Sequence, residues 1–216
     1  MFPNAKKGIS KVFVSEILYL IGTILATVSA VSVILSAADN AGGSFLFGLI
    51  FLLISSILII VAGIIQIVGL ANAAKESNMF RYALFMVILS LVLTLLSALI
   101  KDYSVRDFLY GTFAPNYIIV NISDALSKVL SLVVMFFVIG GINELIPDSE
   151  VAKKSKKIVI LAIITALVSV ILNLITNFSS VAVATTGVIL SLGALVCSLI
   201  YYIMYLVLLA MAKKAL

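Results

Sequence analysis

Hydroxyl and amide side chains inside long apolar stretches are the groups in this sequence whose types and spacing could do chemistry. Two stretches carry such residues at intervals of four: Ser90 and Thr94 in one, and Thr165, Ser169 and Asn173 in the other. Residues four apart share one face of a helix. Each stripe can bond to backbone carbonyls and neighbouring helices, or it can line a path for a substrate. We favour hydrogen bonding to carbonyls and neighbouring helices, and a lining for a substrate path is the alternative.

Four further polar residues stand out within apolar surroundings. Gln66 is the only strongly polar side chain of its stretch, and we expect it to contact a neighbouring helix rather than a ligand. Tyr201, Tyr202 and Tyr205 lie towards the centre of the last stretch instead of at its end. Core tyrosines with bonded hydroxyls are the favoured interpretation, and a wet cavity is the alternative.

Most catalytic and metal chemistry lacks its usual residues here. The chain has no histidine, which is the commonest general base and metal ligand, and its single cysteine, Cys197, lies in an apolar run typical of packing. No phosphate-binding loop, zinc-protease motif or nucleophile elbow occurs. We therefore expect no enzyme activity, no catalytic residue, no cofactor and no metal.

Composition indicates a membrane protein. Of 216 residues, 64% are hydrophobic and 11% charged, and mean hydropathy is +1.34, far from the composition of soluble domains. Residues 44–74 contain no charge, and a helix of that length exceeds the roughly 30 Å of bilayer hydrocarbon. Continuous runs of this kind favour helices over a barrel. We predict an all-α polytopic protein, a single transmembrane domain over 1–216 with six spans at about 15–38, 44–74, 80–100, 123–146, 158–178 and 184–212.

The distribution of lysine and arginine predicts orientation. Counted by alternate connections, eleven lie on one side and three on the other, and the positive-inside rule puts the richer side and both termini in the cytoplasm of a plasma membrane. We expect these lysines to meet anionic lipid, and we exclude nucleic acid because the basic residues form short clusters at the ends of apolar runs. The richer side comprises Lys6, Lys7, Lys11, Lys75, Arg81, Lys153, Lys154, Lys156, Lys157, Lys213 and Lys214, and the other side Lys101, Arg106 and Lys128.

Internal echoes predict a repeated helix pair. The residues 68–72 are echoed at 139–143, and 70–75 at 209–214, which indicates three consecutive helical hairpins in a compact bundle. Gly22, Ala26 and Ala30 recur every four residues and predict a small-residue face for close helix contact. The first span imitates a cleavable signal peptide, but its apolar run is longer than usual, so we expect it to be retained.

The longest connection, residues 101–122, is expected to lie outside the cell. Its aromatic residues fit a membrane interface, and Ser104 to Asp107 resembles a capping box that would begin a short amphipathic helix. Such a connection is either functional or a connector that rests on lipid.

Two hypotheses for function follow from these patterns. The first is a membrane-embedded interaction or accessory protein that binds another membrane protein, lipid or a second copy of itself. The second is a small transporter or channel subunit for a neutral or apolar solute. Ion-driven pumping is disfavoured because the charges lie at or near the ends of the spans.

Overall fold

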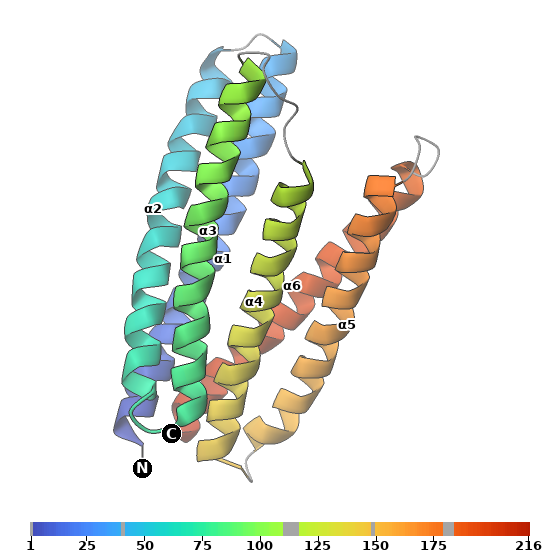
Figure 1. Cartoon of the computed structure of the whole chain (residues 1–216). Helices are drawn as coiled ribbons and strands as arrows, with labels where there is room; N and C mark the ends of the chain where they lie inside the picture. The colour runs from blue at the N-terminus through green and yellow to red at the C-terminus, as the bar shows by residue number, and fades with distance from the viewer. Residues whose placement is uncertain (1, 40–41, 110–116, 148–149, 179–183) are drawn as a thin grey trace. The chain divides into compact units, whose positions relative to one another are not determined.

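The computed structural model describes residues 2–39, 42–109, 117–147, 150–178 and 184–216 (Figure 1). Within them it contains six helices and no strand, which confirms the all-α prediction. A helix satisfies every backbone N–H and C=O group inside one segment, and this is what long apolar runs require in a lipid environment. The helices are α1 (Pro3–Asp39), α2 (Gly42–Ala73), α3 (Asn78–Leu109), α4 (Tyr117–Leu145), α5 (Glu150–Phe178) and α6 (Ala184–Ala215).

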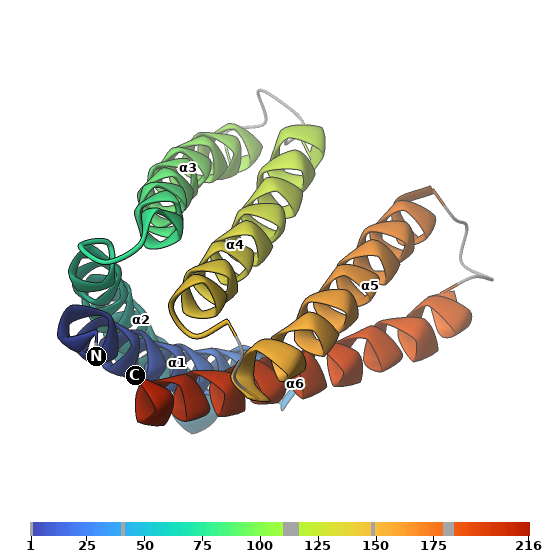
Figure 2. The same ribbon diagram turned by 90° about the horizontal axis from the view of Figure 1, so that it is seen from below.

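The chain divides into two units. The first contains Met1–Glu76, and so α1 and α2, together with the last turns of α6, Leu209–Leu216. The second, Ser77–Leu208, contains α3, α4, α5 and the rest of α6. In the first unit α1 and α2 form an antiparallel hairpin; in the second α3 and α4 form another, and α4 also packs against α5 (Figures 1 and 2).

Small residues at intervals of seven form the interface between α1 and α2. All of them are buried, and each set lies along one line of its helix. A seven-residue interval corresponds to 3.5 residues per turn, which keeps a contact line facing an antiparallel partner helix along its length. Without bulky side chains on that line, the two backbones approach closely. The residues are Gly8, Ser15, Gly22 and Ser29 on α1 and Gly48, Ser55, Ala62 and Gly69 on α2.

Two points on this interface show how close the helices come. A Cβ atom on Gly8 would lie 2.6 Å from the carbonyl oxygen of Gly69 and 2.8 Å from the Cβ of Ala73. Towards the other end, the hydroxyl of Ser29 donates a hydrogen bond of 2.6 Å to the carbonyl oxygen of Gly48. Because backbone atoms are the neighbours at both points, neither position has room for a larger side chain without separating the helices.

The small-residue face of α1 differs from the predicted one. Gly22 is buried as expected, whereas Ala26 is half-buried and Ala30 is exposed. Steps of four residues rotate around a helix by about 40° each, so the line through these three residues leaves the interface. Steps of seven drift by only about 20°, and this is the spacing that α1 uses.

Several helices are longer than the predicted spans. The structure begins α1 at Pro3 instead of about residue 15, and it begins α5 at Glu150, so the lysines at 153–157 lie on a helix rather than in a connection. The structure corrects the predicted outer connection, residues 101–122. Its first part belongs to α3, which continues to Leu109 without a new helix start at Ser104, and its last part belongs to α4, which begins at Tyr117. Residues 110–116 lie outside the described residues.

Among the described residues, two helical stretches are long and apolar enough to cross a membrane, Pro3–Ser32 and Leu46–Ala73. Two shorter apolar stretches, Asn78–Thr94 and Val129–Leu145, lie in α3 and α4. The structure thus contains helices that could span a bilayer, while the six-span bundle of three hairpins and the single domain over 1–216 stay predictions.

Candidate functional site

A buried polar pair on the α1–α2 interface is the candidate site. The Nε2 atom of Gln66 donates a hydrogen bond of 3.1 Å to the Oε1 atom of Glu16. The two side chains are only 8% and 9% exposed, respectively. Each lies beside the line of small residues on its own helix, because Glu16 follows Ser15 and Gln66 precedes Gly69 by three positions. The antiparallel register of the hairpin therefore brings the carboxyl group and the amide together.

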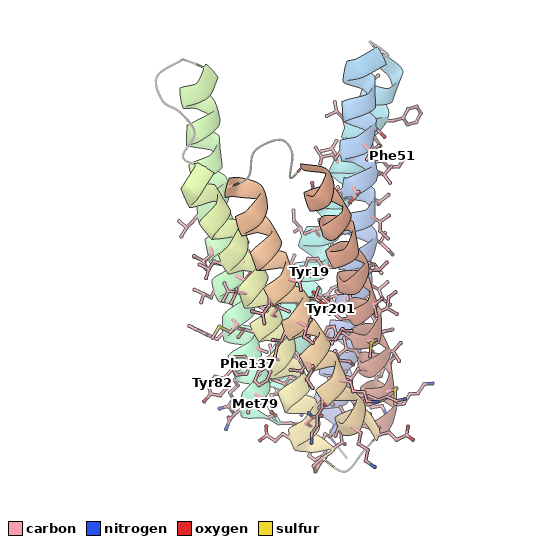
Figure 3. All side chains as sticks on the ribbon, turned by 90° about the vertical axis from the view of Figure 1, so that its right-hand side faces the viewer. Tyr19, Phe51, Met79, Tyr82, Phe137 and Tyr201 are labelled. Carbon is pink, nitrogen blue, oxygen red and sulfur yellow. The ribbon has the colours of Figure 1, made fainter. Side chains whose placement is uncertain are left out.

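Tyr19 extends this polar pair along α1. Its hydroxyl lies over Gly63 of α2, where an added Cβ atom would be 3.2 Å from the hydroxyl oxygen. Figure 3 shows Tyr19 part-way along α1, away from either end of the helix. Glu16 and Tyr19 are three residues apart and so are neighbours on one helix face. A carboxyl group, an amide and a phenol thus occupy one short segment of an otherwise apolar interface.

The chemistry of this site depends on the carboxyl group. A carboxylate removed from water is costly unless it is hydrogen-bonded, and an ionisable side chain inside an apolar span is by default a candidate for function. Such a group can hold or exchange a proton, or it can fix the register of two helices. Glu16 also makes a further interaction beyond its bond to Gln66.

The structure places Gln66 against a neighbouring helix, as the favoured interpretation of the sequence has it. Its partner Glu16 was not among the candidate residues. The predicted span begins at about residue 15 and puts Glu16 at its edge, whereas α1 begins at Pro3 and contains Glu16 more than three turns inside. The signal available in the sequence is that Glu16 is the only acidic residue between Lys11 and Asp39.

The predicted polar stripes show bonding within their own helices where they are described. Thr94 Oγ1 donates to the carbonyl oxygen of Ser90 at 2.8 Å, and Thr165 Oγ1 donates to the carbonyl oxygen of Leu161 at 2.8 Å. Thr94 is exposed and Thr165 is buried. No hydrogen bond between described residues joins the α3 stripe to α5. The side chains of Ser169 and Asn173 lie outside the described residues.

The three tyrosines of α6 are partly or wholly enclosed. Tyr205 is only 3% exposed, and Tyr201 and Tyr202 are half-buried. Each of the three makes an interaction with another group. Figure 3 shows Tyr201 on α6, and all three tyrosines belong to the second unit.

Polar contacts at the helix ends were also missed by the sequence analysis. Both carboxylate oxygens of Glu76 accept hydrogen bonds from backbone N–H groups in the first turn of α1, at 2.9 Å from Asn4 and 2.8 Å from Ala5. These N–H groups have no partner within the helix, and the negative charge also favours a helix N-terminus. A residue that lies 71 or 72 positions away supplies this cap, so no local sequence pattern reveals it.

The second unit has a similar closure. Ser77 Oγ donates to Glu144 Oε2 at 2.6 Å and accepts from the backbone N–H of Met79, so it caps α3 and binds the end of α4. Met79, Tyr82 and Phe137 lie near this end of the hairpin (Figure 3), and the rings of Tyr82 and Phe137 are 5.6 Å apart. On the far side of α4, Asn143 Nδ2 donates to Ser155 Oγ of α5 at 2.9 Å.

The fold and this site define an all-helical protein with two helices able to cross a membrane and a carboxyl–amide pair between them. Among the described residues, no three cysteine or acidic side chains lie close enough to hold a metal ion. Comparisons with protein-family models, with curated proteins and with solved structures found no match.

Proposed function

We propose that this chain is a multi-pass integral membrane protein of the plasma membrane that acts as an interaction or accessory protein, with six spans and both termini in the cytoplasm. The observation that carries the proposal is the outer surface of α2, whose exposed side chains are almost all large and apolar from Leu46 to Val68. They are Leu46, Phe47, Leu49, Ile50, Leu52, Leu53, Ile54, Ile57, Ile60, Val61, Ile64 and Val68.

The size of this apolar surface supports lipid or protein as its neighbour. Fully burying one such side chain is favourable by about 1.5–3 kcal/mol, so leaving a continuous row of them in water would be strongly unfavourable. Soluble monomers rarely expose contiguous apolar patches of more than a few hundred Å². Because α1 already covers the opposite, small-residue face of α2, the outward face is available to acyl chains or to a helix of another membrane protein.

The bonding of the polar stripes is compatible with an interaction protein. The hydroxyls of Thr94 and Thr165 are bonded to carbonyl oxygens one turn earlier in their own helices. A hydroxyl satisfied in this way can lie in an apolar environment without water or solute beside it. The stripes are therefore compatible with helices surrounded by lipid and protein.

One observation favours a second candidate, a small transporter or channel subunit. Glu16 lies within the candidate span Pro3–Ser32, and intramembrane carboxyl groups mark ion and proton pathways in many transporters. The pairing of Glu16 with Gln66 at the α1–α2 interface gives it an alternative, structural role. A test along α5 separates the two candidates.

That test uses single cysteines between Thr165 and Asn173 in a background where Cys197 is replaced by serine. Under the interaction hypothesis, none of these positions reacts with a water-soluble thiol reagent in intact membranes. A reactive position within this segment would support a water-filled path and would overturn the interaction hypothesis in favour of transport.

A second experiment seeks the partner directly. Benzoylphenylalanine replaces Phe47 on the outer face of α2 or, as a matched position in the other unit, Phe85 on α3; the two side chains are 64% and 61% exposed. We expect light-induced adducts with a membrane protein from the Phe47 position. Adducts with lipid alone from both positions would contradict a protein partner on this face.

A further inference from the structure

Five lysines from three distant segments of the chain come together at one end of the first unit. Lys6 and Lys7 lie in the first turns of α1, Lys75 lies two residues after the end of α2, and Lys213 and Lys214 lie in the last turn of α6. All three segments belong to the same unit. We call these five residues the lysine cluster.

Two observations place these segments side by side. The carboxylate of Glu76 binds the N–H groups of Asn4 and Ala5, which holds the end of α2 against the beginning of α1. The N-terminus of the chain and the end of α6 lie next to each other in both views (Figures 1 and 2). Around the end of α6, Leu209, Ala212 and Leu216 are buried, whereas Lys213 and Lys214 are exposed, so this end of the helix is packed and its lysines face outward.

The positive charge of the lysine cluster is not balanced by its surroundings. Glu76 is the acidic residue beside it, and both of its oxygens are occupied by backbone N–H groups. Within the described part of the chain, none of the five ammonium groups makes an ion pair. Lys7, Lys75, Lys213 and Lys214 are exposed, and Lys6 is half-buried. Ammonium groups gathered at one end of a unit repel one another, and an anion among them reduces this repulsion.

Apolar side chains of the same unit lie directly beyond the cluster. Val14 on α1 and Ile64 and Val68 on α2 are exposed, and Phe2 is exposed next to Lys6. A ligand that fits this combination has a negative group at the lysines and hydrocarbon along the helices. A free phosphate or a nucleic acid would satisfy the charge but leave the apolar side chains uncovered.

We propose that the lysine cluster binds the headgroups of anionic phospholipids, whose acyl chains lie along the exposed faces of α1 and α2. The proposal rests on the membrane location given under the proposed function and deepens it, because it assigns one lipid class to one end of one unit. Each lysine near a charged bilayer surface contributes roughly a fivefold gain in binding.

The test is a lipid titration of the full-length protein in mild detergent, followed by native mass spectrometry with phosphatidylglycerol or phosphatidylcholine. We expect the wild-type protein to prefer phosphatidylglycerol. The variant with Lys6, Lys7, Lys213 and Lys214 replaced by Gln should bind it at least about tenfold more weakly, with phosphatidylcholine binding unchanged. A variant with the same four positions replaced by Arg should keep the wild-type preference.

The matched control removes the same charge from the other unit, through replacement of Lys153, Lys154, Lys156 and Lys157 on α5 by Gln. This control should change phosphatidylglycerol binding by less than about twofold, because it leaves all five residues of the lysine cluster in place. Equal losses in the two Gln variants, or no lipid preference in the wild-type protein, would overturn the proposal. So would complete competition by glycerol phosphate, which carries the headgroup charge without acyl chains.

Two further measurements distinguish a loss of lipid binding from misfolding, and a failure of the lysine cluster from a failure of the membrane location. If the four-lysine Gln variant aggregates on size exclusion, the variant with only Lys213 and Lys214 replaced by Gln is used, and a smaller but selective loss is expected. Alkaline extraction of wild-type membranes tests the location itself. A chain that stays in the membrane but shows no lipid preference refutes the lysine cluster alone, whereas a chain that is extracted refutes the proposed function as well.

Discussion

Gln66 donates its side-chain amide to the carboxyl group of Glu16 across the α1–α2 interface, with 3.1 Å between the two atoms. Both side chains are buried beside the line of small residues, which itself contains the buried serines Ser15, Ser29 and Ser55. A polar pair in such a position specifies one register of two helices, because any shift along the axis leaves a buried group without its partner.

This pair predicts a non-additive effect on stability. We expect Gln66→Leu alone to destabilise the hairpin by about 1–3 kcal/mol, because it removes a hydrogen bond from a buried carboxyl group. The double variant Glu16→Leu, Gln66→Leu should be more stable than the sum of the single changes predicts. Unfolding by SDS in mixed micelles measures all four proteins. Strict additivity would show that the pair is not coupled.

The close approach at Gly8 predicts the effect of one added methyl group. We expect Gly8→Ala to destabilise the first unit by about 1–3 kcal/mol, because the new Cβ would lie 2.6 Å from the Gly69 carbonyl oxygen and backbone must move. The control is Gly140→Ala on α4, where the nearest atom to the added Cβ is 3.7 Å away, on the side chain of Met79. That variant should be neutral or slightly stabilising, since alanine favours helix more than glycine does. Equal effects of the two changes in thermal unfolding would contradict the interface described for α1 and α2.

Gly141 and Phe80 predict a rescue between α3 and α4. A Cβ atom on Gly141 would lie 2.8 Å from ring atoms of Phe80, and this ring is fully buried and cannot move aside easily. We expect Gly141→Ala to be destabilising and Phe80→Leu to relieve part of that loss in the double variant. The measurement is again unfolding in mixed micelles. If the double variant loses more stability than the sum of the losses in the two single variants, this contact is excluded as the cause.

Glu76 predicts a capping effect at a distance. We expect Glu76→Ala to destabilise the first unit by about 1 kcal/mol, because it frees the backbone N–H groups of Asn4 and Ala5 at the start of α1. Glu76→Gln keeps one acceptor oxygen and should retain part of the stability. Hydrogen exchange of the first turn of α1 reports the change locally. Unaltered exchange in Glu76→Ala would contradict the cap.

The helical class and much of the element order could be predicted from the apolar runs, because such runs leave few other ways to satisfy the backbone. The start of α1 could not be predicted in this way, because the segment from Pro3 to Lys11 is polar. In the structure this segment is helical, with Gly8 packed against Gly69 and the first turn capped by Glu76. The echo between 68–72 and 139–143 aligns Gly69 with Gly140, but the close contacts of the two hairpins do not follow this alignment. Gly69 lies against Gly8 of α1, whereas in the second hairpin it is Gly141, one residue after Gly140, that lies against Phe80 of α3.

The candidate site was predicted only in part for a related reason. Gln66 is conspicuous as the one strongly polar residue of its run, and its contact with another helix follows from that. Glu16 is recognised only when the register of α1 against α2 is known, because nothing local links it to a residue 50 positions away. The seven-residue interval of small residues, which sets this register, is present in the sequence but overlaps a four-residue pattern at Gly22.

The membrane location of the α1–α2 hairpin is tested most directly by thiol labelling at the middle of α2. In a background with Cys197 replaced by serine, Ile57→Cys puts a thiol on the outer face, where the isoleucine is 61% exposed, and Lys75→Cys puts one just beyond the end of the helix. In intact membranes we expect a water-soluble maleimide to label the Lys75 position and leave the Ile57 position unreacted until the membrane is dissolved and the chain unfolded. Equally fast labelling of both positions in the intact membrane would contradict a lipid-facing α2.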